Sequence, residues 1–210
     1  MPDNRRPEAI IAKQRLVFAR GTSIEAYANL EQSLCSFFTL LIQTPPGTAA
    51  VIFFKMANSR SRNEILSKLQ KKQFGDTYSA FWNSLIKRVR SLDEMRNQIV
   101  HWIEASDLYD LDGVNHWRFK LIPPNFWHRT PDTPSLTIGQ LTEFITECVF
   151  VSRVLNLFIL ALKGQECFEG ETPDSSLQKF QQPIVYPPPD NHSLFRIYKA
   201  PQIPPESFPA

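Results

Sequence analysis

The sequence predicts an all-α fold: a bundle of four or five helices with a small inserted β-hairpin and a proline-rich C-terminal tail. Apolar residues recur three and four positions apart over most of residues 1–163, which is the spacing of helices that bury one face. Five prolines and glycines interrupt that spacing between residues 106 and 136, which indicates an insertion. Residues 164–210 are rich in proline and poor in apolar runs, so we expect a weakly ordered tail.

The first two helices are expected on either side of a glycine. One should cover residues 7–20, because a proline at its start suits a first helical turn, and Gly21 should end or weaken it. Thr22 and Glu25 have the spacing of a capping box. They predict a second helix that stops before the prolines at 45–46.

The next segments follow the same logic. A short apolar helix is expected over 49–57. Ser61 and Glu64 have the spacing of a second capping box, which predicts a helix to about residue 72. Gly75 should break that helix before the long one that follows.

The long helix, expected over 78–104, has an arginine on its apolar face. Its apolar ridge comprises Phe81, Leu85, Val89, Leu92, Ile99 and Ile103. At about 100° per residue, Arg96 falls near the centre of this ridge. Because a lone guanidinium is costly to bury, Arg96 should have an anion, a carboxylate or water as its partner.

The remaining segments comprise a hairpin and a last long helix. Alternation over 116–122 predicts one strand of a hairpin within the 106–136 insertion. The helix expected over 137–163 is apolar enough to imitate a membrane span, but Glu147, Arg153 and Asn156 lie within it. Such groups are costly in lipid, so we interpret it as the central helix of a soluble bundle.

Composition limits the cellular context. The net charge of the 210 residues is +2, which gives no strong overall attraction to nucleic acid or anionic lipid, so any polyanion must be bound by a local site. The odd set Cys35, Cys148 and Cys167 and an N-terminus without an apolar segment favour a reduced, cytoplasmic protein. We expect no membrane partner and no cofactor, and the cysteine spacings fit no metal site.

Arg96, Asn97 and His101 are the candidate catalytic residues. Arginine binds phosphate oxygens in a forked geometry, histidine exchanges protons near neutral pH, and asparagine orients either group. These are sufficient groups for metal-independent RNA cleavage. Glu31 is a supporting candidate that either orients Arg96 or His101 or is a solvated or ion-paired glutamate. Five other basic residues either contact an RNA backbone or are merely solvated: Arg88, Arg90, Lys68, Lys71 and Lys72.

At these residues the chain resembles the HEPN superfamily (higher eukaryote and prokaryote nucleotide-binding domains). The family signature is an arginine, four to six residues and a histidine, often with asparagine after the arginine, and Arg96, Asn97 and His101 match it with four intervening residues. The resemblance covers roughly 22–163, apart from the insertion. It implies a helical bundle, a symmetric homodimer whose motifs meet at the interface, and endoribonuclease activity in toxin–antitoxin, phage-defence or RNA-processing systems, with an antitoxin protein as a partner.

The sequence therefore predicts a HEPN-like bundle over residues 1–163 that cleaves RNA with Arg96, Asn97 and His101. The alternative is a non-catalytic helical interaction or nucleotide-binding module, in which Arg96 makes a structural ion pair.

Overall fold

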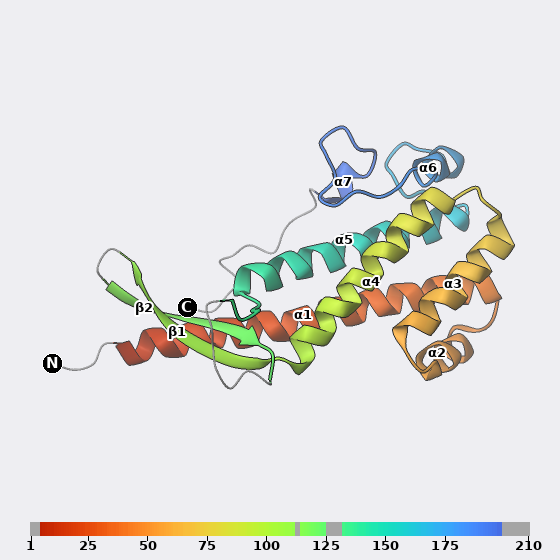
Figure 1. Ribbon diagram of the computed structural model, residues 1–210. Helices are drawn as coiled ribbons and strands as arrows, with labels where there is room; N and C mark the ends of the chain where they lie inside the picture. Colours follow the sequence, from red (N-terminus) through yellow and green to blue (C-terminus); the bar gives the residue numbers. More distant parts are fainter. Residues whose placement is uncertain (1–4, 112–113, 125–131, 199–210) are drawn as a thin grey trace. The chain divides into compact units, whose positions relative to one another are not determined.

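The computed structural model describes residues 5–111, 114–124 and 132–198. These are mainly α-helical, with one small antiparallel sheet (Figure 1). The elements in chain order are α1 Arg5–Ile42, α2 Pro46–Lys55, α3 Ser59–Phe74, α4 Ser79–His101, β1 Ile103–Leu111, β2 Val114–Ile122, α5 Ile138–Leu162, α6 Pro173–Lys179 and α7 Phe195–Tyr198.

The chain divides into two compact units, and α1, α4 and α5 contribute residues to both. Unit 1 includes residues 5–27 and the described part of 94–146, and unit 2 includes residues 28–93 and 147–198. The sequence predicted one bundle with an insertion and a tail, so this division differs from the expectation.

In unit 1 the hairpin pairs β1 with β2 in register from Ile103↔Ile122 to Leu111↔Val114. Leu121 extends the pairing through two backbone hydrogen bonds with Leu136, both 2.9 Å. The hairpin therefore begins three residues before the predicted insertion. Ile103 and Glu104, which were expected in the last turn of the long helix, instead pair with β2, so that their backbone N–H and C=O groups form hydrogen bonds in the sheet.

In unit 2 an aromatic cluster forms the core. The Phe158 ring lies within 6 Å of four others, those of Phe37, Tyr78, Phe81 and Phe180. Trp82 packs against Phe37 and donates its indole N–H to Ser67 Oγ at 3.0 Å. Ring pairs of this kind contribute beyond the area they bury, so this cluster joins α1, α4, α5 and the segment after α6.

Two helix boundaries in the first half differ from the predictions. α1 is continuous through Gly21, so Gly21 does not end a helix, and the cap predicted at Thr22 is wrong. A helical glycine costs about 1 kcal/mol, but buried Ala19, Ser23 and Ala26 on both sides hold the helix together.

The cap of α3 also differs. Asn58, three residues before the predicted Ser61, accepts the Ser61 N–H at 2.8 Å, while Glu64 pairs with Arg60 at 3.1 Å. The predicted break at Gly75 is confirmed, because Gly75 ends α3. Gly75 and Gly164, which follows α5, have φ of 59° and 72°, the left-handed region that glycine adopts readily.

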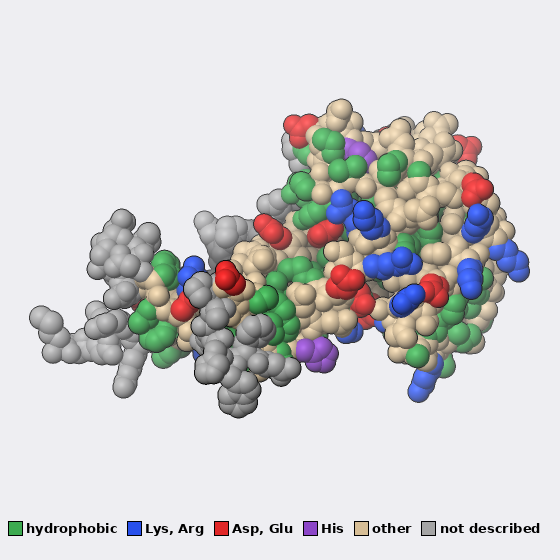
Figure 2. Space-filling model, in the orientation of Figure 1, with side chains coloured by type: hydrophobic (Ala, Val, Ile, Leu, Met, Phe, Trp, Pro, Cys, Tyr) green, Lys and Arg blue, Asp and Glu red, His purple; other side chains and the backbone are tan. Residues whose placement is uncertain are grey.

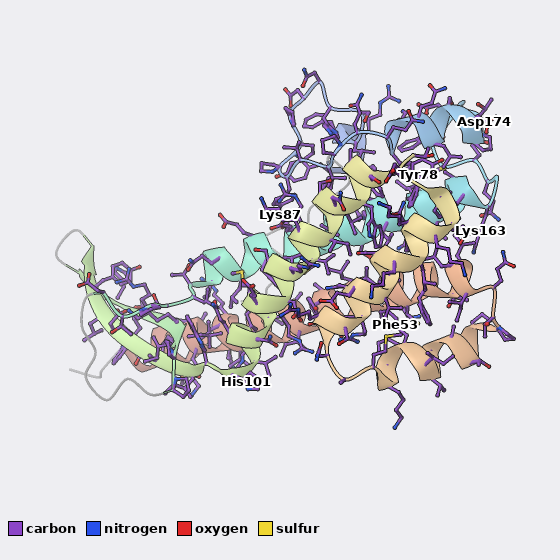
Figure 3. The ribbon with its side chains drawn as sticks, turned by 45° about the vertical axis from the view of Figure 1, so that its right-hand side comes forward. Phe53, Tyr78, Lys87, His101, Lys163 and Asp174 are labelled. Carbon is purple, nitrogen blue, oxygen red and sulfur yellow. The ribbon has the colours of Figure 1, made fainter. Side chains whose placement is uncertain are left out.

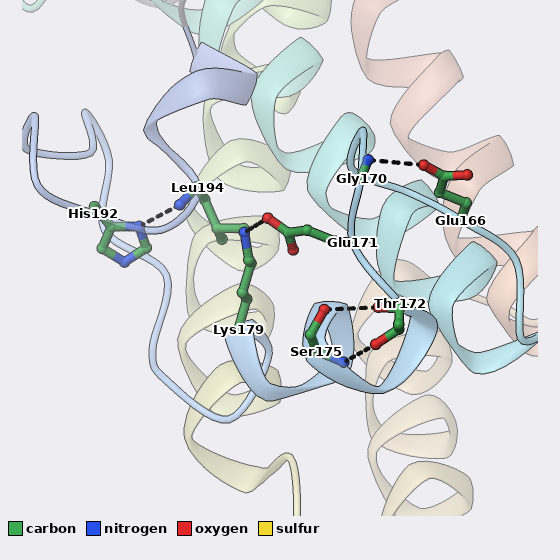
Figure 4. A network of polar contacts seen from close by, with 8 residues as sticks. All are labelled: Glu166, Gly170, Glu171, Thr172, Ser175, Lys179, His192 and Leu194. Carbon is green, nitrogen blue, oxygen red and sulfur yellow. Dashed lines mark hydrogen bonds and ion pairs between the residues drawn. The ribbon is translucent and has the colours of Figure 1, made fainter.

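The C-terminal segment differs from the weakly ordered tail that the sequence predicted, at least up to residue 198. Phe180, Ile184 and Leu194 are buried, and the Ile184 N–H donates to Ser84 Oγ at 2.8 Å. Figure 4 shows the local polar contacts, among them Lys179 to Glu171 at 2.6 Å and the Leu194 N–H to His192 Nδ1 at 3.1 Å. A few large side chains thus bind this segment to unit 2 despite its prolines.

By length and composition, helix α5 could cross a membrane. The buried core helix of a soluble protein meets the same criteria. Among the described residues, α1 and α2 pass the same test only as a pair bent by 117°. Within unit 2, Val151, Val154, Leu155 and Phe158 of α5 are fully buried, and its Glu147 pairs with Arg88 at 2.8 Å.

Candidate functional site

The three motif residues lie at the C-terminal end of α4, in unit 1. Arg96 is half-buried, whereas Asn97 and His101 are exposed. The ridge prediction holds for the residues on either side, because Leu92 and Ile99 are buried. It fails at Ile103, which lies on β1 and is exposed.

Arg96 lies on an aromatic ring. Its guanidinium carbon is 5.3 Å from the centroid of Tyr27, a ring of α1 that is only 2% exposed. Tyr27 in turn stacks on Phe144 of α5, with centroids 6.4 Å apart and planes 17° apart. A cation over an aromatic face is stabilised without any anion, so this contact lets an arginine occupy an apolar ridge.

The one hydrogen bond of Arg96 to a described residue runs from Nη1 to Asn97 Oδ1, at 2.9 Å. No carboxylate pairs with Arg96 within the described ranges. The guanidinium therefore keeps its full charge and most of its donors, which is the condition that anion binding requires.

His101 is the last residue of α4, as Figure 3 shows. Arg20 of α1 holds the backbone on both sides of it. The Arg20 guanidinium donates to the carbonyl oxygens of Val100 and Trp102, at 2.8 and 3.1 Å. A cation at a helix C-terminus satisfies the last carbonyls and stabilises the helix end. Arg20 thus fixes the backbone that presents the imidazole.

The partner of Glu31 is neither Arg96 nor His101. Its carboxylate pairs with Arg62 of α3 at 2.6 Å, and both side chains are largely buried. The Arg62 guanidinium also lies over the Phe53 ring, 5.3 Å from its centroid. Glu31 therefore forms an ion pair within unit 2, which is the second of the two roles that the sequence left open.

Helix geometry separates the two principal groups. Five residues correspond to about 140° around α4 and about 7.5 Å along it. The side chains of Arg96 and His101 in one copy therefore leave the helix in different directions. By its chemistry Arg96 can bind a phosphate, and His101 can transfer a proton.

Sequence reasoning missed Tyr27 and Arg20 as part of this site. Tyr27 lies in the helix that the sequence predicts after Gly21, and Arg20 is the last residue of the helix predicted before it. The aromatic side chain of Tyr27 is the one signal that the sequence offers for its role. Arg20 gave no sequence signal, because its partners are backbone atoms eighty and more residues away. Within the described ranges, no group of three His, Cys, Asp or Glu side chains is arranged to hold a metal ion.

No protein family, curated protein or solved structure matches this chain.

Proposed function

We propose that this protein is a metal-independent endoribonuclease of the HEPN type, with a HEPN-like bundle as its fold. The observation that carries the proposal is the state of Arg96. It is a half-buried arginine held by the Tyr27 ring and Asn97, with no carboxylate partner among the described residues. An arginine fixed in position with its charge uncompensated is suited to a scissile phosphate, whose negative charge grows in the transition state.

In the proposed reaction, His101 removes the proton from a ribose 2′-hydroxyl. The 2′-oxygen then attacks the adjacent phosphorus, the bond to the 5′-oxygen breaks, and a protonated histidine donates a proton to that leaving oxygen. The products are a 2′,3′-cyclic phosphate and a free 5′-hydroxyl. Arg96 neutralises the phosphate, and Asn97 orients the guanidinium through the hydrogen bond to Nη1.

We propose a symmetric homodimer as the active form, in which two copies of the motif converge. The angle of about 140° between Arg96 and His101 on one helix supports this. In a twofold arrangement, Arg96 of one copy and His101 of the other act on the same phosphate. The protein would act in the cytoplasm as a toxin or defence component, with an antitoxin protein as a further partner.

The test is cleavage of single-stranded RNA in the presence of a chelator. Wild type should cut, and Arg96→Ala and His101→Ala should lose most activity. Lys87→Ala is the matched control, because Lys87 is an exposed cation of the same helix, and it should cut normally. Intact RNA with the wild type, or equal cutting by all variants, would refute the ribonuclease proposal.

The dimer has its own test. Inactive Arg96→Ala and His101→Ala proteins are mixed after partial unfolding and refolding, so that mixed dimers form. Such a dimer retains one intact arginine and one intact histidine on different copies. Recovery of part of the wild-type activity is expected. If the wild type sediments as a monomer while cutting RNA, the shared site is wrong.

The rival is a non-catalytic helical interaction or nucleotide-binding module, and the contact of Arg96 with Tyr27 is the observation that favours it. In that case the arginine stabilises the fold and does nothing else. Stability measurements on Arg96 variants separate the two roles.

A further inference from the structure

Helix α2 exposes an apolar face. Of its ten residues only Ala49 and Phe53 are buried, and Phe53 packs on Phe38 with centroids 5.6 Å apart. On the other side Val51 is 64% exposed, Ile52 46% and Phe54 47%. Single exposed apolar residues are ordinary, but three in four consecutive positions form a patch that needs a partner.

Helix α3 lies beside α2 and extends this surface (Figures 1 and 3). The Arg62 guanidinium over the Phe53 ring connects the two helices. Ile65, Lys68 and Lys72 follow at spacings of three and four residues and so share one face of α3, and all three are exposed. Figure 2 shows hydrophobic and basic side chains next to each other where these helices lie.

The segment that contains α2 and α3 has a positive net charge, whereas the rest of the chain has a negative one. Residues 44–75 contain six Lys and Arg and one Glu, a net charge of +5. Because the whole chain carries +2, the remaining residues carry −3. Arg60 and Lys71 have acidic partners on the surface. Lys55, Lys68 and Lys72 have none among the described residues, so their charges are available to an anionic partner.

We propose that this surface, which we call the α2–α3 surface, docks on an anionic lipid bilayer. It comprises Val51, Ile52, Phe54, Lys55, Ile65, Lys68 and Lys72. Apolar side chains that enter the boundary between headgroups and acyl chains, surrounded by lysines that meet anionic headgroups, are the combination that holds a protein on a membrane surface. From the sequence we expected no membrane partner, because the net charge of the whole chain is only +2. That total conceals the positive charge concentrated in residues 44–75.

Two other occupants fit less well. An RNA backbone would use the lysines, but single-stranded RNA is held by stacking successive bases on aromatic rings. Three of the four apolar residues of the surface, Val51, Ile52 and Ile65, are aliphatic, so Phe54 alone among them offers a ring. A second copy would bring the three lysines of one surface against the three lysines of the other, which is repulsive. The inference does not depend on ribonuclease activity, because α2 and α3 belong to unit 2 and contain none of the three motif residues.

The size of the effect follows from the charges. Each Lys near an anionic surface strengthens binding about fivefold. Reversing Lys68 and Lys72 should therefore weaken binding by more than about 25-fold. High salt should weaken the wild type similarly, because the screening length falls from about 10 Å at 0.1 M to about 3 Å at 1 M.

The experiment measures co-sedimentation of the full chain with vesicles of phosphatidylcholine alone or mixed with phosphatidylserine. Wild type should bind the mixed vesicles at least about tenfold more tightly than the neutral ones. Lys68→Glu/Lys72→Glu and Val51→Ser/Phe54→Ser should each lose this binding. Lys87→Glu and Val185→Ser are matched controls, because both residues are exposed on unit 2 outside the surface, and they should bind normally.

Each alternative has a recognisable outcome. Equal binding to both kinds of vesicle, or equal losses in the controls, overturns the proposal. So does a result in which the wild type ignores vesicles but binds single-stranded RNA through Lys68 and Lys72. A wild-type dimer that Val51→Ser/Phe54→Ser converts to a monomer would show that a second copy covers the surface. Circular dichroism of each variant confirms that it is folded.

Discussion

Two arginines of α4 allow a direct comparison between a structural and a functional role. Arg88 pairs with Glu147 at 2.8 Å, donates to the Tyr186 carbonyl at 3.3 Å and lies 5.6 Å from the Tyr186 ring centroid. Arg96 lies two turns later, and its partners among the described residues are the Tyr27 ring and the neighbouring Asn97 amide. The perturbation is the same in both cases, substitution by alanine.

The contacts give the expected costs. For Arg96→Ala, the lost cation–ring contact is worth about 1 kcal/mol at a half-buried site, and the bond to exposed Asn97 adds about 0.5 kcal/mol at most. For Arg88→Ala, Glu147 remains with its side chain 22% exposed. Breaking a buried pair costs about 3–5 kcal/mol and an exposed one under about 1, so this partly buried pair should cost about 2–3 kcal/mol.

Urea denaturation of the two variants beside the wild type measures these losses, provided that the slopes agree. Arg88→Ala should destabilise the protein clearly more than Arg96→Ala. If Arg96→Ala costs as much as Arg88→Ala, Arg96 is a structural residue, and the ribonuclease proposal loses the observation on which it stands. Arg96→Met, which keeps an apolar side chain over Tyr27, should recover part of the stability without restoring cleavage.

Three further predictions address other parts of the chain. Arg20→Met should cost about 1–2 kcal/mol, because two carbonyl groups lose a charged donor, and should speed amide exchange at the end of α4; unchanged exchange would contradict this capping role. Burial by itself would raise the pKa of Asp107, but hydrogen bonds from Lys120 and Arg118 lower it overall, below its usual 3.8. Its contribution to stability is therefore present above pH 3.8 and is lost as the pH falls through the folded value. The difference in urea midpoint between wild type and Asp107→Asn should shrink over that range, and a constant difference would refute it. Phe180→Ala should cost about 3–4 kcal/mol, and a loss under about 1 kcal/mol would mean that the segment after α5 is loosely held after all.

The spacing of apolar residues predicted the helices well where the apolar face is buried and a glycine follows the end of the helix. The ridge from Phe81 to Ile99 is buried as expected, and Gly75 and Gly164 stop their helices. Gly21 shows the limit of this reasoning. A glycine breaks a helix only if nothing else holds it, and the residues that hold α1 together are buried by other parts of the chain.

The segment after α5 was predicted poorly for a related reason. Its average composition is polar and rich in proline, but Phe180 places one large ring among those of Phe81 and Phe158. Composition averages over residues, whereas packing depends on single side chains and on distant partners. Whether such a segment is ordered is therefore decided by a few contacts that local spacing does not reveal.

The candidate site illustrates the same limit in its chemistry. An arginine on an apolar ridge signals an unusual environment, and the sequence offered an anion, a carboxylate or water as its partner. The structure provides an aromatic face instead, and the difference matters for function. A carboxylate would neutralise the guanidinium and occupy its donors, whereas the Tyr27 ring stabilises the charge and leaves the N–H groups largely unused. The residue that decides whether Arg96 is available to a phosphate therefore lies on another helix, at the point where α1 passes the end of α4.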